Sequence, residues 1–196
     1  MSIWTCKARA FAAFGVIALA ACDALPVPQA TGGGGAKALT QTDLARGGVR
    51  LVAPEGYCID RRSLRARFAL MGRCDTLGVD GFFRDKDLAI ITTSTVPVAA
   101  GTPNPGANAL AAEPDAELVS SVERDGLSFV RLRSRSGGRI EGVGDTFWRT
   151  AFVLNDQLVS FVLYAPAGSP ALEREGLRTL ERAVRVTQAA TTQIPG

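Results

Sequence analysis

The segment TFWRTAFVLNDQLVSFVLY restricts the fold of this chain more than any other part of the sequence. It consists of two stretches rich in β-branched and aromatic residues, Thr146 to Leu154 and Gln157 to Tyr164, with the turn signal NDQ where they meet. This pattern is typical of two neighbouring antiparallel strands joined by a tight turn. We therefore expect a β-hairpin within an antiparallel sheet.

Other short runs of apolar and β-branched residues predict further strands. These runs cover Val49 to Ala53, Arg67 to Cys74, Asp87 to Val96 and Leu127 to Arg133. A long loop with four prolines, PVAAGTPNPGANALAAEP, follows the third of them. The strands on either side of this loop are expected to belong to one sheet.

The segment DAELVSSVERDG, from Asp115 to Gly126, predicts a helix. Asp115 is a suitable N-cap, and a helical period places Leu118, Val119 and Val122 on one face. Gly126 is then the stop signal at the C-terminal end.

A second amphipathic helix is predicted near the C-terminus, in SPALEREGLRTLERAVRVTQ. Ser169 is its expected N-cap, and Pro170 occupies the first helical position, where proline is favoured. The apolar side of the helix carries Leu172, Leu177, Leu180, Ala183 and Val184, and the polar side carries Arg174, Arg178 and Arg182. We expect the apolar side to cover the sheet.

The order of these elements predicts an α+β fold, with an antiparallel sheet of about five to six strands and two helices packed on it. This order, together with AIITTSTVP and FWRTAFVLNDQLVSFVLYAP, resembles the PsbP-like fold of photosystem extrinsic subunits and of several exported bacterial lipoproteins. In GYCID (Gly56 to Asp60) and GRC (Gly72 to Cys74) the chain also resembles small uncharacterised exported proteins of α-proteobacteria. Neither resemblance implies a known catalytic residue.

The first 21 residues have the layout of a secretory signal peptide. Lys7 and Arg9 form a positive region, and an apolar run from Ala10 to Ala21 follows and ends in small residues. As a helix, this run would reach only about 18 Å, whereas a bilayer core is about 30 Å thick. We expect the segment to direct export and then to be removed.

The run ends in Leu19-Ala20-Ala21-Cys22, which resembles the lipobox of bacterial lipoproteins. The resemblance implies that a diacylglyceryl group with palmitate-type acyl chains is attached to the Cys22 sulfur, and that cleavage leaves Cys22 first. The lipid bilayer would then be a partner of the protein. The alternative is an ordinary signal peptide that is cleaved near a cysteine.

Asp23 resembles the signal that retains lipoproteins in the inner membrane of enteric bacteria, although other bacterial groups read this position differently. It favours the periplasmic face of the inner membrane over the outer membrane. Beyond it, residues 22–48 are rich in Pro, Gly, Ala and Thr, which predicts a lipidated flexible tether. Residues 49–188 are expected to form a single domain, and residues 189–196 a disordered tail.

Four cysteines are present, but Cys6 would leave with the signal peptide and Cys22 would carry lipid. Cys58 and Cys74 remain, and in an oxidising compartment we expect them to form a disulfide. Closing a loop of this length stabilises a fold by about 3 kcal/mol in the chain-entropy model. A redox or metal pair is the alternative, but the chain has no CxxC motif and no histidine.

The absence of histidine excludes Ser-His-Asp and Cys-His catalysis and the common zinc sites. Four aspartates cluster in CDTLGVDGFFRDKD, but their spacing is not that of a calcium loop, so solvated turn residues are favoured over a calcium site. They are Asp75, Asp80, Asp85 and Asp87. We predict no catalytic residue, no cofactor and no metal.

Arginines are numerous, and Arg131, Arg133 and Arg149 are candidates for contact with an anionic surface. Arg131 and Arg133 alternate along a predicted strand and so point from the same face. A solvent-exposed face balanced by nearby acids is the simpler interpretation. Nucleic acid is not expected as a partner, because the loss of Lys7 and Arg9 leaves 20 of 22 basic residues against 19 acidic ones.

Two hypotheses on function follow. The first is a lipoprotein on the periplasmic side of the membrane that acts as a non-catalytic binding or scaffolding module for an unknown envelope protein. The second is an enzyme that uses carboxylates to act on envelope polymers. An enzyme should show a deep pocket where two acids converge, and a binding module should show a shallow surface.

Overall fold

A computed structural model describes residues 38–77, 88–137 and 142–193, all of which belong to one structural unit, Ala36–Gly196. The predicted signal peptide, Cys22, Asp23 and most of the predicted tether lie outside the described residues. No helix in the described part of the chain combines the length and the apolar character needed to cross a bilayer.

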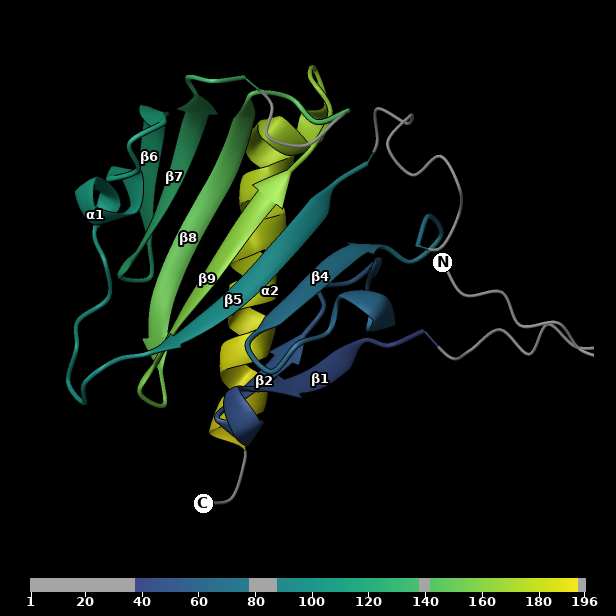
Figure 1. Cartoon of the computed structure of the whole chain (residues 1–196), viewed down its shortest axis with the longest axis vertical. Helices are drawn as coiled ribbons and strands as arrows, with labels where there is room; N and C mark the ends of the chain where they lie inside the picture. The colour runs from purple at the N-terminus through teal and green to yellow at the C-terminus, as the bar shows by residue number, and fades with distance from the viewer. Residues whose placement is uncertain (1–37, 78–87, 138–141, 194–196) are drawn as a thin grey trace, which may run out of the picture. The chain divides into compact units, whose positions relative to one another are not determined.

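Seven strands form the main sheet, in the order β3-β4-β5-β9-β8-β7-β6, and every neighbouring pair is antiparallel (Figure 1). The strands are β3 (Tyr57–Ile59), β4 (Phe68–Arg73), β5 (Ile90–Pro97), β6 (Ala116–Arg124), β7 (Leu127–Ser134), β8 (Thr146–Leu154) and β9 (Gln157–Tyr164). The α+β class with an antiparallel sheet is confirmed, and the strand count is somewhat higher than expected.

The hairpin predicted from residues 146–164 is the centre of this sheet, with β5 beside β9 and β7 beside β8. Its turn residues Asn155 and Asp156 both have positive φ, 48° and 55°. Two left-handed residues in a two-residue turn match the twist of antiparallel strands, and Asn and Asp tolerate this conformation. The local sequence therefore specifies the register of the central pair.

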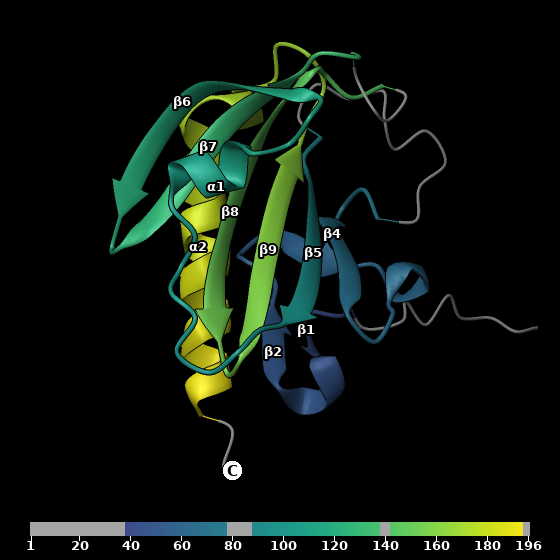
Figure 2. The same cartoon turned by 60° about the vertical axis from the view of Figure 1, so that its left-hand side comes forward.

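The two faces of the sheet bury different side chains. Phe129, Trp148 and Phe161 belong to the larger core cluster, whereas Val130 and Phe147, each one residue away, belong to a smaller one. The short helix α1 (Ala107–Ala111) covers the smaller cluster with Leu110, and α2 (Arg174–Thr192) covers the larger one. Figure 2 shows α1 in front of the sheet and α2 behind it.

The predicted helix from Asp115 to Gly126 is wrong, because Ala116–Arg124 forms the edge strand β6. Asp125 and Gly126, with φ of 50° and 73°, make a two-residue turn into β7. A β-bulge between Leu118 and Ser120 interrupts the alternation of the strand, so its apolar residues imitate a helical period. The second helix is α1, which lies instead within the expected long loop.

The C-terminal helix is confirmed, but it begins later and ends later than predicted. Ser169 caps a short 3-10 helix, η3 (Pro170–Leu172), where its Oγ accepts a hydrogen bond of 3.2 Å from the Ala171 amide. The chain turns at Glu173, and α2 then continues to Thr192. The first part of the expected disordered tail is therefore helical, and residues 194–196 lie outside the described residues.

The ordered fold also begins earlier than Val49. A hairpin of β1 (Gln41–Leu44) and β2 (Val49–Val52), joined by the short 3-10 helix η1 (Ala45–Gly47), occupies the end of the predicted tether. Leu44 is the single apolar residue of β1, so the strand has no recognisable pattern in the sequence. The side chains of Leu44, Val49 and Leu51 are nevertheless buried in the larger core cluster.

The predicted disulfide between Cys58 and Cys74 is present. Cys58 lies in β3 and Cys74 follows β4 directly, with 4.8 Å between the two Cα atoms. The connecting segment contains the 3-10 helix η2 (Arg61–Ser63), in which Asp60 accepts a hydrogen bond from the Arg62 amide. The bond therefore fastens the outermost strand pair, β3 and β4, at the end where β4 stops.

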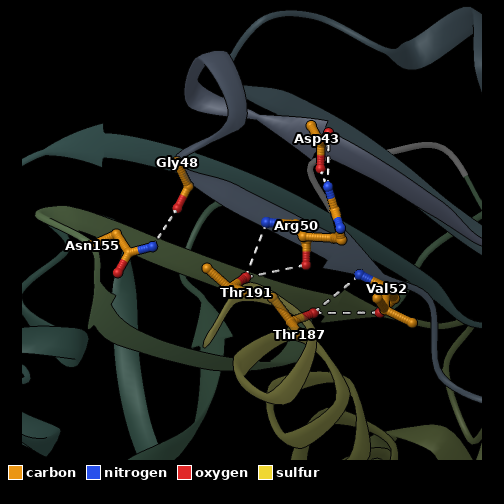
Figure 3. A network of polar contacts seen from close by, with 7 residues as sticks. All are labelled: Asp43, Gly48, Arg50, Val52, Asn155, Thr187 and Thr191. Atoms are coloured by element: carbon orange, nitrogen blue, oxygen red, sulfur yellow. Dashed lines mark hydrogen bonds and ion pairs between the residues drawn. The ribbon is translucent and has the colours of Figure 1, made fainter. Parts of the chain in front are cut away.

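Two threonines of α2 bind the outer edge of β2 (Figure 3). Thr191 Oγ1 accepts a hydrogen bond of 3.0 Å from the Arg50 amide and donates to the Arg50 carbonyl at 3.3 Å. Thr187 Oγ1 makes the same pair of contacts with Val52, at 3.3 and 3.4 Å. Both threonines are fully or almost fully buried. They replace the neighbouring strand that the edge of β2 lacks, and so attach the small hairpin to the helix.

Replacing either threonine with the isosteric valine should remove these hydrogen bonds and leave the partly buried amide and carbonyl of β2 unsatisfied. We expect Thr187→Val and Thr191→Val each to lower the free energy of unfolding by about 2 kcal/mol. Urea denaturation, monitored by circular dichroism, measures the change in the free energy of unfolding. Thr192→Val is the matched control, because Thr192 is exposed and should change stability by less than about 0.5 kcal/mol. Equal effects of all three variants would contradict this account.

Candidate binding groove

The three arginines proposed for an anionic surface do not lie together. Arg131 and Arg133 lie on the face of the sheet that carries α2, and Arg149 lies on the α1 face, opposite Val130. Arg149 pairs with Glu113 at 2.9 Å, and Arg133 lies 3.8 Å from Asp145. These arginines are balanced by nearby acids, as in the simpler interpretation.

The aspartate cluster is described only in part. Asp75 pairs with Arg73 at 3.2 Å, and the hydrogen bond from this guanidinium holds the pKa of the Asp75 carboxyl below its usual range. Asp80, Asp85 and Asp87 lie outside the described residues. In the described ranges no three metal-ligating side chains come together.

A groove of about 550 Å³ lies between the edge strand β6 and the helix α2. Trp148 of β8 and Leu177 of α2 supply apolar surface to it. The indole Nε1 of Trp148 donates a hydrogen bond of 3.0 Å to the Leu172 carbonyl, which fixes the orientation of the ring. The lining is completed by Ser120, Val122, Arg124, Arg131, Glu173, Arg174, Arg178 and Glu181.

Two ion pairs hold the walls of the groove together. Arg131 donates to both carboxylate oxygens of Glu173, at 2.9 and 2.7 Å, which ties the sheet to the first residue before α2. Arg124, at the end of β6, lies 3.7 Å from Glu181. The bidentate pair of Arg131 and Glu173 is more stable and more directional than the single contact of Arg124 and Glu181.

Arg174 and Arg178 are different from the other charged residues of the groove. Both are exposed, and neither has a carboxylate partner within the described residues. They lie one turn apart on α2, so both guanidinium groups extend from the same side of the helix. Four arginines and two glutamates line the groove, which therefore has an excess of positive charge.

A smaller hollow of about 150 Å³ continues the groove past the ion pair of Arg124 and Glu181. It is lined by Leu127 and Phe129 of β7 and by Val184, Arg185 and Gln188 of α2. Arg185 is also exposed and has no carboxylate partner in the part of the chain that the structure describes. Asp125 and Glu181 also line this hollow and offset the charges of Arg124 and Arg185, so the excess of positive charge is confined to the larger groove.

Sequence reasoning identified the arginines of α2 as its polar side but missed the opposite wall of the groove. The reason is that β6 was interpreted as a helix. The dipeptide Asp125-Gly126, flanked by two stretches with β-branched residues, was the available signal, because Asp-Gly favours two-residue hairpin turns.

Gly176 sets how closely α2 approaches the floor of the groove. A Cβ atom at this position would overlap the carbonyl oxygen of Ala171 and lie 3.0 Å from Cδ1 of Trp148. Since Gly176 is buried in the first turn of the helix, neither neighbour has free space to move into. Glycine is thus required for the packing of η3, α2 and Trp148.

Alanine favours a helix over glycine by about 1 kcal/mol, yet we expect Gly176→Ala to destabilise the fold by about 2 kcal/mol, because the overlap with the backbone outweighs helix propensity. Thermal or urea denaturation measures the difference. Gly106→Ala is the control, since a Cβ atom there meets nothing, and it should change stability by less than about 0.5 kcal/mol. A Gly176→Ala variant that is as stable as the parent would contradict the packing described here.

No protein-family model and no curated protein sequence matches this chain. Solved structures do match. The Ran-binding protein Mog1p of Saccharomyces cerevisiae superposes with a TM-score of 0.50 at 11% identity, over 77% of this chain and 96% of Mog1p. The chain therefore shares its fold with Mog1p.

Two further structures are similar at lower scores. A point mutant of Mog1 gives a TM-score of 0.48 at 13% identity, over 76% of this chain and 96% of the other. The cyanobacterial PsbP of Synechocystis gives 0.39 at 13% identity, over 80% of this chain and 94% of the other. The structural neighbours thus include both Mog1 and a member of the PsbP-like group.

Proposed function

We propose that this protein is a lipid-anchored, periplasmic binding module that holds an anionic ligand of the cell envelope in the groove between β6 and α2. The observation that carries the proposal is the pair Arg174 and Arg178, which project at the groove without a carboxylate partner among the described residues. A guanidinium group presents several donors in a plane that fits a carboxylate or a phosphate. The adjoining apolar surface of Trp148 and Leu177 offers contact area beside these charges.

The two acids of the groove support binding rather than catalysis. The Glu173 carboxylate accepts two hydrogen bonds from Arg131, and Glu181 lies beside Arg124. Each carboxylate is thus held by an arginine from the opposite wall of the groove. These acids therefore suit the structural role of holding the walls together. Mog1p, which has the same fold, is a Ran-binding protein, so in that protein the fold serves the binding of a partner.

Membrane attachment is proposed from the lipobox at Leu19 to Cys22 and from the disulfide of Cys58 and Cys74, which suits an oxidising compartment. Two acyl chains on one residue give stable anchoring, whereas a single chain gives only marginal binding. Asp23 favours the inner membrane for this attachment. The groove would then face ligands at or near the membrane surface.

Replacing Cys22 with serine should prevent acylation. The protein should then be found in the soluble fraction or should keep its signal peptide. Metabolic labelling with palmitate, followed by fractionation and intact-mass analysis, measures this. Cys6→Ser is the matched control, because Cys6 lies within the signal peptide and should leave both labelling and fractionation unchanged. Unaltered palmitate labelling of Cys22→Ser would refute the lipoprotein proposal.

Binding of an anion can be tested with soluble inorganic polyphosphate and the exported protein. Trp148 is the sole tryptophan once Trp4 has been removed with the signal peptide, so its fluorescence reports on the groove. Arg174→Ser with Arg178→Ser should weaken binding by about tenfold, which corresponds to about 1.4 kcal/mol. Arg182→Ser removes one positive charge a turn beyond Arg178, at a residue that does not line the groove, and it should have little effect. Equal losses in both variants would point to unspecific attraction and contradict the groove.

A further inference from the structure

The strand β6 forms one edge of the seven-stranded sheet, and within the described residues it pairs only with β7. It is 9 residues long, and most of its side chains are exposed on both faces. Leu118 and Val119 are each 40% exposed. An edge of this kind presents a row of main-chain donors and acceptors to a partner.

The turn at Asp125 and Gly126 decides which groups of β6 point outward. In a two-residue hairpin the flanking residues, here Arg124 and Leu127, exchange main-chain hydrogen bonds, and such pairs alternate along the strands. Val122 therefore also bonds to β7. The amides and carbonyls of Ser121 and Glu123 point away from the sheet.

We propose that the ligand of the groove is an extended, acidic segment of a partner protein, which adds to the sheet as a strand beside β6. This inference rests on the proposed binding function and names the class of ligand. The main chain of the segment pairs with Ser121 and Glu123, and its acidic side chains reach Arg174 and Arg178. The regular part of β6, from Ser120 to Arg124, sets the length of pairing, because the bulge at Val119 interrupts the edge.

The side chains of β6 show which residues of the added strand enter the groove. Ser120, Val122 and Arg124 line it, and directly opposite residues of paired strands point to the same face. Alternate residues of the added strand therefore point toward α2. They are about 6.8 Å apart, close to the rise of about 6 Å between Arg174 and Arg178 along the helix. A segment with an acid at every second position matches this spacing.

Charge favours an acidic partner over a second copy of this chain. A symmetric pair formed through two β6 edges would place both positive grooves on the same face of the joined sheet. Each groove needs acids as binding partners, whereas a second groove with the same excess of positive charge repels it. A partner with alternating carboxylates supplies these acids and also the main-chain hydrogen bonds, as in known cases of strand addition.

A synthetic peptide that alternates Glu and Thr over the length of β6 tests the proposal. The exported protein is purified in non-ionic detergent, and binding is followed by Trp148 fluorescence and calorimetry. In the proposed arrangement the Thr amides face β6 and the Glu amides face solvent. N-methylation of the Thr residues should therefore weaken binding by about tenfold or more, whereas N-methylation of the Glu residues should change it little. Arg174→Ser with Arg178→Ser should weaken binding of the unmethylated peptide, and Arg182→Ser should leave this binding unchanged.

The remaining outcomes separate this inference from the proposed function. If both methylated peptides bind equally and still need Arg174 and Arg178, strand addition is wrong and the anionic groove stands. Strand addition is also overturned if phosphatidylglycerol vesicles or polyphosphate bind through these arginines and the peptide does not. If the peptide and polyphosphate both fail to bind, the proposed function and the inference fail together.

Discussion

The packing of α2 against one face of the sheet is the constraint on which the rest of the structure depends. Leu180, Ala183 and Val184 of the helix are buried against aromatic residues of the central strands, in the same cluster as the β1–β2 hairpin. Thr187 and Thr191 bind the edge of that hairpin. A single helix therefore holds the seven-stranded sheet and the two-stranded sheet in one core.

The position of α2 also explains the groove. The helix contacts β2, β8 and β9, whereas β6 is absent from the core cluster that the helix covers. The edge of the sheet consequently extends past the helix, and within the described residues the ion pairs Arg131–Glu173 and Arg124–Glu181 bridge the space beside it. The arginines on the outer side of α2 border this space. A binding surface thus arises where the core ends and the sheet continues.

Several parts of the fold were predictable because their causes are local. The Asn155-Asp156 turn and its flanking strands specify the central hairpin, and Ser169 with Pro170 marks the start of the last helical segment. Cys58 and Cys74 are the two cysteines that would remain after the predicted export and acylation, so their pairing could be predicted. The strand β1 could not be predicted in this way, because Leu44 is its one apolar residue and is buried in a core cluster built from residues far along the chain.

For this protein, residue patterns alone were enough to establish the α+β class, the disulfide and the arginines on one side of α2, since periodicity and composition express them directly. The groove depends on contacts between distant segments. Glu173 neutralises Arg131 across 42 residues of chain, and Arg174 has no such partner in the described ranges. The bulge in β6 made a strand resemble a helix, and only pairing with β7 resolved this ambiguity. Which charges remain free to bind a ligand is therefore a property of the folded arrangement, because it depends on which elements lie next to each other in space.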